Sequence, residues 1–313
     1  MQVQEGVGWA ELAPLGSIRA VTVLVTGASG LIGRSLVPFL AARDEVRACV
    51  RRPEAADPLR AAGAKVAVGG WDEVDALAEI SRGVYTLIHL VGGANQPDFD
   101  HMLAANHGSV LTALAAAREA KVRRFILVSV PGASVDTTHP YLRAKGLAEE
   151  AVANSGLEHA IVRSTHAYGL GGLWFTSVVE GALTVPPFVV GSGEQIVAPV
   201  LADDLAAVIV AADDHVGDLC GTWALEGPDA LSAAELVGRL TPTGVDPVPV
   251  PADAAAARLT ERLGASVSVL ASEFFALPSR ADAPDAASAF GVERTPFDEG
   301  LRRTMERASA VGR

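Results

Sequence analysis

Apolar residues recur along the chain in two alternating patterns. Short runs rich in β-branched residues, at 21–25, 45–52, 65–70, 84–93 and 124–130, predict five strands. The stretches between them, including 36–42, 75–81 and 99–120, carry apolar residues at helical spacing and predict helices. Strands separated by helices in this way are typical of an α/β fold, a doubly wound parallel sheet with helices on both faces. Right-handed crossovers then place a ligand at the carboxyl ends of the strands.

The first strand runs into a glycine-rich turn and then into a helix. Glycine is needed at 27 for the turn and at 30 for the close approach of a pyrophosphate, and Gly33 lets the helix pack closely. Free N–H groups at the start of the helix favour an anion there. The turn therefore predicts dinucleotide binding, and its candidate cofactor residues are Gly27, Ser29, Gly30, Leu31, Ile32 and Gly33.

Composition excludes some classes of partner. A formal charge of -12 and a pI near 5.0 disfavour nucleic acid, which attracts basic surfaces. Apolar runs are interrupted before about twenty residues, so no membrane span is predicted. Residues 1–20 show no secretory pattern. We therefore expect a cytoplasmic monomer or homodimer that acts on a small molecule. Cys49 and Cys220 lack metal-ligand spacing and are predicted to be buried apolar residues.

The end of the second strand bears on the type of nucleotide. A site for NAD(H) usually has an acid there for the ribose 2′-hydroxyl, whereas a 2′-phosphate needs cations. This chain has Arg51 and Arg52. Because a guanidinium matches the geometry of a phosphate, the pair favours NADP(H), with NAD(H) as the alternative if the arginines are only solvated.

Tyr141 and Lys145 follow the fifth strand at the spacing of one helical turn. Pro140 suits the start of that helix, which then carries both side chains on one face. A lysine ammonium favours the phenolate of a nearby tyrosine and lowers its pKa toward neutrality. The pair therefore predicts acid/base chemistry.

With these residues together, the chain resembles the short-chain dehydrogenase/reductase superfamily, in its extended or atypical branch near the NmrA-like and complex-I-accessory-subunit-like members. The resemblance rests on residues 26–33, 128–129, 141–145 and 161–169, and continues through 199–204 and 290–301. It implies a Rossmann-type sheet in which Tyr141 moves a proton and Lys145 binds the nicotinamide ribose. It further implies a cofactor lining that includes Val91, Gly92, Gly93, Arg163, Ser164 and Thr165.

The same resemblance implies how the chain is divided. Residues 1–20 form an extension, 21–165 the NAD(P)-binding domain, and 166–313 a smaller, mainly helical substrate-binding part. Segments near 196–226 return from that part to the sheet. Residues 252–264 and 267–277 predict two of its helices.

Two positions depart from the pattern of the superfamily. The Ser or Thr that polarises a substrate carbonyl would stand two residues after Ser129, where this chain has Pro131, which cannot donate. The residues that could act in its place are Ser129, Ser134, His139 and His166. The adenine-binding Gly-Asp pair is replaced by Gly69-Gly70-Trp71-Asp72, so either Asp72 serves from a shifted place or a backbone amide serves alone.

Several residues have both a functional and a structural interpretation. Trp174 and Phe175 either stack on the substrate or pack in the core. Phe274 and Phe275 either close the pocket or pack a dimer. His89, inside the fourth strand, is interpreted as a core residue. Asp203 and Asp204 are predicted to cap a helix rather than bind a metal, and no metal site is expected.

These features favour an NADP(H)-dependent oxidoreductase that acts on a carbonyl or alcohol of a small, fairly apolar substrate. Tyr141 would be the proton donor or acceptor, and Lys145 would assist it. Two alternatives stay open. A non-catalytic NAD(P)-binding redox sensor or assembly subunit is favoured by Pro131. An epimerase or dehydratase that oxidises its substrate transiently uses the same Tyr/Lys pair.

Overall fold

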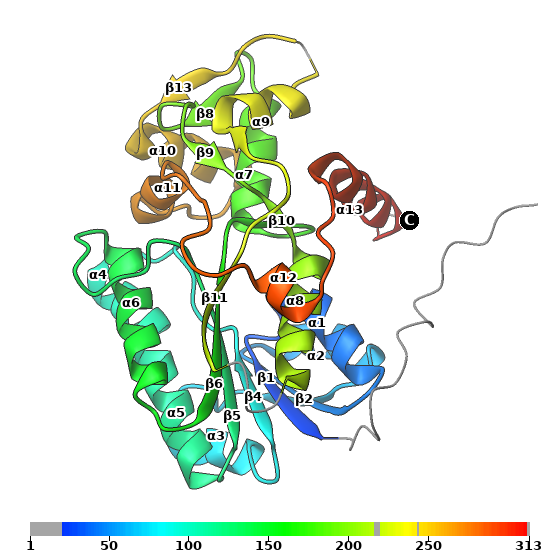
Figure 1. Ribbon diagram of the computed structural model, residues 1–313. Coiled ribbons are helices and arrows are strands. Elements are labelled where there is room, and N and C mark those ends of the chain that lie inside the picture. Colours follow the sequence, from blue (N-terminus) through cyan, green and yellow to red (C-terminus); the bar gives the residue numbers. More distant parts are fainter. Residues whose placement is uncertain (1–20, 216–219, 243, 312–313) are drawn as a thin grey trace, which may run out of the picture.

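A seven-stranded sheet forms the centre of the computed structural model, which describes residues 21–215, 220–242 and 244–311 (Figure 1). Neighbouring strands are parallel throughout, in the order β3-β2-β1-β4-β5-β6-β11. The strands are β1 (Thr22–Thr26), β2 (Glu45–Val50), β3 (Lys65–Val68), β4 (Thr86–His89), β5 (Arg124–Ser129), β6 (Glu158–Ser164) and β11 (Gly221–Leu225). The predicted doubly wound α/β fold is confirmed. The predicted extension at 1–20 lies outside the described residues.

Helices cover both faces of this sheet. One face carries α3 (Val74–Ile80), α4 (Phe99–Leu103), the π-helical turn η3 (Ala104–Gly108), α5 (Ser109–Glu119) and α6 (Pro140–Ala153). The other carries α1 (Leu31–Ala41), the short 3-10 turn η2 (Pro53–Ala55), α2 (Ala56–Ala61), α8 (Ala202–Asp214) and α12 (Ala286–Phe290). The carboxyl ends of all seven strands therefore meet at one edge.

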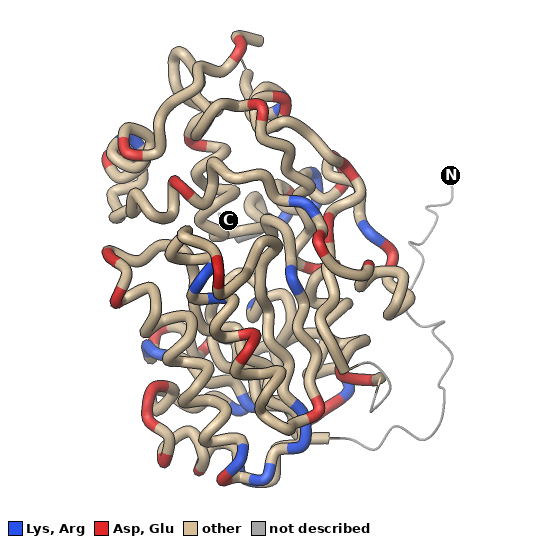
Figure 2. Tube along the Cα trace, turned by 60° about the vertical axis from the view of Figure 1, so that its left-hand side comes forward, with Lys and Arg blue, Asp and Glu red and all other residues tan. Residues whose placement is uncertain are grey.

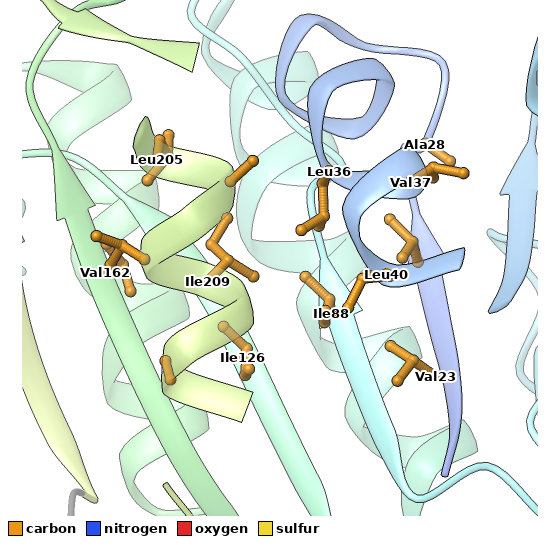
Figure 3. Packing of buried hydrophobic residues seen from close by; sticks show 14 of the residues in the cluster. Val23, Ala28, Leu36, Val37, Leu40, Ile88, Ile126, Val162, Leu205 and Ile209 are labelled. Carbon is orange, nitrogen blue, oxygen red and sulfur yellow. The ribbon is translucent and has the colours of Figure 1, made fainter. Parts of the chain in front are cut away.

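Alternate side chains along each strand enter two different cores. Val23 and Val25 pack beneath α1 and α8, whereas Leu24 between them packs beneath the helices of the opposite face. Figure 3 shows the first core, where Leu36 of α1 and Ile209 of α8 point toward the strands. Each fully buried residue of this kind contributes about 1.5–3 kcal/mol, so the sheet and its helices form one stable frame.

The C-terminal part stands over the carboxyl ends of the strands (Figure 1). Its short strands pair as β7 (Ala167–Tyr168) with β10 (Val200–Leu201), β8 (Phe188–Val190) with β13 (Val248–Val250), and β9 (Ile196–Val197) with β12 (Leu231–Ser232). Its helices are α7 (Leu173–Ala182), α9 (Ala233–Leu240), α10 (Ala252–Leu263), α11 (Val269–Phe275) and α13 (Phe297–Val311). Of the segments near 196–226, β11 joins the large sheet beside β6 and α8 covers it, whereas β9 and β10 pair outside it.

Three structural predictions need correction. Asp204 does not cap α8, because its carboxylate accepts hydrogen bonds from the backbone and hydroxyl of Thr295, and Asp203 pairs with Arg307. The helix predicted over 99–120 is interrupted by the π-helical turn η3. Cys49 is buried as predicted, but Cys220 is exposed.

Charged residues of both signs are spread over the molecule. In Figure 2, Lys and Arg are interspersed with Asp and Glu around the outside of the described chain. Within 21–215, 220–242 and 244–311, no helix is long and apolar enough to cross a membrane.

Gly33 is the residue at which the first helix and the turn before it come closest. A Cβ there would lie 2.4 Å from the carbonyl oxygen of Ala28, so the backbone would have to move. Gly33→Ala should therefore lower the free energy of unfolding by about 1–3 kcal/mol in urea denaturation. Gly238→Ala is the matched control, because a Cβ in that exposed part of α9 meets nothing within 4 Å; it should raise stability by about 0.5–1 kcal/mol. Equal effects of the two substitutions would contradict this account of the turn.

Candidate active site

The glycine turn lies at the carboxyl edge of the sheet, between β1 and α1. Gly27 has a φ of +71°, and a Cβ there would lie 2.7 Å from the backbone of Leu90. α1 begins after Gly30 with no side-chain cap and no acidic residue in its first turn, so its first N–H groups are free to bind an anion. Arg34 donates hydrogen bonds to the carbonyls of Ser29 (3.1 Å) and Leu170 (2.6 Å), which holds the turn against the loop after β7.

The end of β4 supplies a second stretch of exposed backbone. Gly92 and Gly93 have φ values of +128° and +147°, and a Cβ on Gly92 would lie 2.4 Å from Oδ1 of Asn106. The Asn106 side chain accepts a hydrogen bond from the N–H of Gly93 (2.8 Å) and donates one to its carbonyl (3.1 Å). Val91, just before them, is half-buried. The predicted strip 91–93 is therefore fixed in place by a buried amide from η3.

The predicted nucleotide-binding side chains at the ends of β2 and β3 are exposed. Arg51 and Arg52 follow β2 directly, and their guanidinium groups make no hydrogen bond or ion pair within the described residues. Asp72 is exposed after β3. Burial, with a smaller contribution from Asp72, raises the pKa of the Cys49 thiol to about 11, which places this carboxylate near the end of β2.

These features fit a dinucleotide. The uncapped start of α1 suits a pyrophosphate, the backbone at Gly27 and Gly92 leaves no room for a side chain, and two unpaired guanidinium groups lie beyond β2. The residues that would hold the group are those of the turn at 27–33, the strip 91–93, Arg51 and Arg52.

α6 brings Tyr141 and Lys145 to the same edge of the sheet. Lys145 is buried, and its Nζ donates a hydrogen bond to the carbonyl of Val128 in β5 at 2.6 Å. Burial lowers its pKa to about 8, against a smaller opposing effect of Glu149. Burial also raises the pKa of Tyr141 above its ordinary value. The expectation that Lys145 lowers the tyrosine pKa is therefore wrong for this structure, because the ammonium is directed at Val128 and the loss of water dominates.

The loop between β5 and α6, which carries Pro131, is packed tightly against that helix. A Cβ on Gly146 would lie 2.3 Å from the backbone of Ser134, so α6 and the loop touch directly. The hydroxyl of Ser134 accepts a hydrogen bond from the N–H of Asp136 within the loop. Ser134 is therefore part of the support beneath α6.

Arg163 fastens this loop from outside. Its guanidinium donates to the carbonyl of Ala133 and pairs with Glu149 of α6 (2.7 Å) and Asp282 (3.0 Å). Asp282 in turn accepts a hydrogen bond from the N–H of Gly132 at 2.7 Å. Arg163 thus acts on the loop and α6 through three partners.

Three predicted site residues have buried polar atoms with no hydrogen-bond partner among the residues that the structure describes: Ser129 Oγ, His139 Nε2 and His166 Nε2. His139 is the N-cap of α6, and its Nδ1 accepts a hydrogen bond from the N–H of Leu142 at 3.5 Å. His166 is stacked on Trp174, with 4.5 Å between the ring centroids and 14° between the planes. A buried polar atom without a partner costs about 1–3 kcal/mol, so such a group is a candidate for binding a ligand.

Phe274 of α11 lies among these side chains. Its ring centroid is 4.7 Å from that of Tyr141 and 5.1 Å from that of His166. Phe175, in contrast, packs against Tyr168 in the C-terminal core. Within one chain, Phe274 therefore covers the candidate site, whereas Phe175 is a core residue and not a stacking surface.

The remaining predicted residues are bonded within the fold. The hydroxyls of Ser164 and Thr165 donate to the carbonyls of Thr165 and Ala198. His89 hydrogen-bonds with Thr26 and Ser109 and, as predicted, is a core residue; burial lowers its pKa to about 3. The structure thus brings the turn, the strip 91–93, Tyr141, Lys145, Ser129, His139 and His166 to one edge, and leaves Ser164 and Thr165 as internal contacts.

The sequence analysis missed Asn106 and Asp282. A polar amide inside the otherwise apolar stretch 99–120 was an available signal for Asn106. Asp282 stands in a loop, 119 residues from Arg163, and no local pattern marks it.

Comparisons with known proteins agree with this geometry. The family model described as NAD(P)H-binding matches residues 27–170. A (4-alkanoyl-5-oxo-2,5-dihydrofuran-3-yl)methyl phosphate reductase of Streptomyces griseus is 28% identical over 70% of this chain and 72% of its own length. An uncharacterised sugar epimerase of Bacillus subtilis is 30% identical over 45% of this chain and 70% of its own length.

Two further known proteins are similar to this chain. Subunit 9 of the 1 alpha subcomplex of mitochondrial NADH dehydrogenase (ubiquinone) of Arabidopsis thaliana is 31% identical over 70% of this chain, which spans only 57% of that relative. The solved structure of MoeE5 in complex with UDP-glucose and NAD has a TM-score of 0.72 and 20% identity, covering 93% of this chain and 100% of that one. The second similarity shows the fold alone.

The buried imidazole of His166 gives a testable dependence of stability on pH. Burial lowers its pKa to about 3, whereas an unfolded histidine titrates near its ordinary 6.5. Between these values the unfolded state binds the extra proton, so stability should fall as the pH is lowered from 6.5 toward 3. His166→Phe keeps an aromatic ring on Trp174 and removes the titrating imidazole. In urea denaturation, the free energy of unfolding of the variant should fall less steeply as the pH is lowered, by up to about 1.4 kcal/mol per pH unit. Parallel curves for the two proteins would contradict a neutral, buried His166.

Proposed function

The chain belongs to the NAD(P)H-binding Rossmann family and is an enzyme of the NAD(P)-dependent oxidoreductase type, and from this premise we propose that it reduces the carbonyl group of a small, fairly apolar substrate with NADPH. The observation that carries the proposal is the buried Tyr141, held on α6 at the edge of the sheet where the glycine turn lies. The relative from Streptomyces griseus, named as the reductase of a (4-alkanoyl-5-oxo-2,5-dihydrofuran-3-yl)methyl phosphate, supports the reaction class at 28% identity.

Tyr141 is suited to donate a proton. Its hydroxyl is protonated at neutral pH, because burial raises its pKa still further above 7, and it is therefore available as a donor. When bound, the nicotinamide supplies the hydride. The Tyr141 hydroxyl gives its proton to the carbonyl oxygen of the substrate, where negative charge develops.

Lys145 and Ser129 support this step. The hydrogen bond to Val128 fixes the Lys145 ammonium beside the end of β5, where it would hold the ribose of the cofactor. With a pKa of about 8 it is still largely charged at pH 7. Ser129, at the end of β5, has a buried hydroxyl free to bond the substrate or the tyrosine. Pro131 has no hydrogen to donate, so the carbonyl oxygen of the substrate must accept its second hydrogen bond from another residue.

We propose NADP(H) over NAD(H) as the cofactor because of the two arginines after β2. Both guanidinium groups are exposed and free of ion pairs within the described residues, so they can bond a 2′-phosphate without breaking an existing contact. An NAD(H) site would have a carboxylate at this position.

An assembly subunit is the second candidate function. It is favoured by Pro131 and by the similarity to the Arabidopsis thaliana subunit. Tyr141 argues against it, because a scaffold has no need of a buried acid beside a cofactor-binding lysine. The epimerase alternative has support from the Bacillus subtilis relative, but it requires Tyr141 to act as a base, which its raised pKa disfavours. The cytoplasmic location, the division near residue 165 and the monomeric or dimeric state stay predictions.

Replacing the proposed proton donor tests the reaction. With NADPH and a panel of aromatic and aliphatic ketones, Tyr141→Phe should lower kcat about 100-fold or more. Its Kd for NADPH, followed by nicotinamide fluorescence, should stay within about twofold. Tyr85→Phe is the matched control; Tyr85 lies just before β4, at the other edge of the sheet, and its ring contact with Arg124 is kept. Full turnover by Tyr141→Phe would show that another group delivers the proton.

The nucleotide preference is tested separately. Arg51→Ala with Arg52→Ala should raise the Kd for NADPH about tenfold to a hundredfold and change the Kd for NADH little, since charged hydrogen bonds contribute about 1.5–3 kcal/mol each. Arg60→Ala with Arg82→Ala removes the same charge from exposed positions paired with Asp57 and Glu79. An equal loss for NADPH and NADH would refute the role in phosphate binding.

A further inference from the structure

Phe274 occupies the space directly beside the proposed proton donor. The Tyr141 ring meets it edge-on at 4.7 Å, His166 meets it edge-on at 5.1 Å, and His139 lies 6.3 Å away. Tyr141 is 7% exposed and His166 is 6% exposed, so a substrate can reach them only if a covering group moves. Phe274 is one of the partly buried side chains that cover Tyr141, it also contacts the His166 ring, and it is carried by the seven-residue helix α11.

Two polar atoms around Phe274 are buried without a partner. Nδ1 of His139 accepts the N–H of Leu142, so the neutral ring carries its proton on Nε2, a donor that meets no acceptor. Nε2 of His166 is likewise buried and unpartnered. Such atoms are costly unless a ligand satisfies them. The surroundings of Phe274 thus have two polar positions among aromatic and aliphatic side chains.

The His166 ring is stacked on Trp174. Trp174 lies parallel to the His166 ring and is buried with it in the C-terminal core, so the imidazole plane is fixed. Burial lowers the pKa of both His166 and His139, so both rings are neutral at pH 7. Two neutral imidazoles complement an uncharged ligand rather than a phosphate or a carboxylate.

The charged groups of this region are engaged or point elsewhere. Lys145 is bonded to Val128, and Glu149 is bonded to Arg163. Glu273, next to Phe274, is exposed; its charge favours the protonated form of His139, but burial outweighs it. A bound anion would therefore gain no cation at the position of Phe274.

We propose that Phe274 closes the substrate pocket and that the substrate is a flat, aromatic, uncharged carbonyl compound whose ring takes the place of the Phe274 side chain between Tyr141 and His166. Its polar atoms then pair with Nε2 of His139 and of His166, and the His139 donor supplies the hydrogen bond that Pro131 cannot. This inference rests on the proposed reduction and adds the class of substrate to it.

Binding tests the inference apart from turnover. Isothermal titration calorimetry on the full chain saturated with NADP+ would compare 2-acetylnaphthalene, its 6-carboxylate and 2-decanone. The uncharged naphthyl ketone should bind at least tenfold more tightly than either of the others. His139→Phe, which keeps a ring but loses the Nε2 donor to the carbonyl oxygen, should weaken its binding about tenfold, the equivalent of one hydrogen bond.

Phe274→Ala gives a result that a merely structural residue would not give. Removing the ring leaves a cavity beside Tyr141 and His166, and apolar cavities of this kind bind aromatic molecules. The variant should melt at a lower temperature yet bind 2-acetylnaphthalene several-fold more tightly, because nothing has to be displaced. Phe99→Ala, at an exposed position of α4, is the matched control and should leave the affinity unchanged.

The outcomes separate the two proposals. Weaker or absent binding of 2-acetylnaphthalene by Phe274→Ala, or equal affinity for the ketone and its carboxylate, would overturn the inference whether or not any ketone is reduced. Tight binding of 2-acetylnaphthalene with no reduction by NADPH would support the pocket and reject the proposed reaction.

Discussion

The contact between α6 and the end of β5 is the constraint on which the candidate site depends. Gly146 lies so close to the backbone of Ser134 that no side chain fits, and Lys145 reaches the carbonyl of Val128. Because two adjacent residues of the helix are fixed, one to the strand and one to the loop after it, Tyr141, one turn earlier, has little freedom to change its position. Its distance from the glycine turn is set by the spacing of parallel strands rather than by a flexible loop.

Loss of water, rather than the neighbouring cation, sets the protonation of this site. A lysine near a tyrosine favours the phenolate, but desolvation penalises every charged form, and here both groups are deeply buried. Burial raises the pKa of Tyr141 and lowers that of Lys145. Burial likewise lowers the pKa of His166 to about 3, so its imidazole is neutral. Each shift thus depends on how completely the surrounding segments exclude water.

The parts that could be predicted from the sequence are those encoded locally. The alternation of strands and helices and the turn at 27–33 follow from residues close together in the chain, and so does the placement of Tyr141 and Lys145 on one helix. The raised pKa of Tyr141 could not be predicted, because it results from burial by segments distant in the sequence, such as α11. The pairing of Arg163 with Asp282 and the position of Phe274 likewise depend on contacts between residues more than a hundred positions apart.

The ion pair between Arg163 and Asp282 also affects which parts of the chain can be exchanged with those of a relative. They join β6 to the segment between α11 and α12, and Asp282 holds the loop after β5 through Gly132. A chimera that joined residues 21–165 to the C-terminal part of a relative would keep Arg163 and its pair with Glu149 but lose the carboxylate of Asp282, unless the donor had an acid at the matching place. The loop after β5 would then lose one of the contacts that hold it, although every residue of 21–165 was native. An exchange of either segment alone therefore separates the two sides of this ion pair.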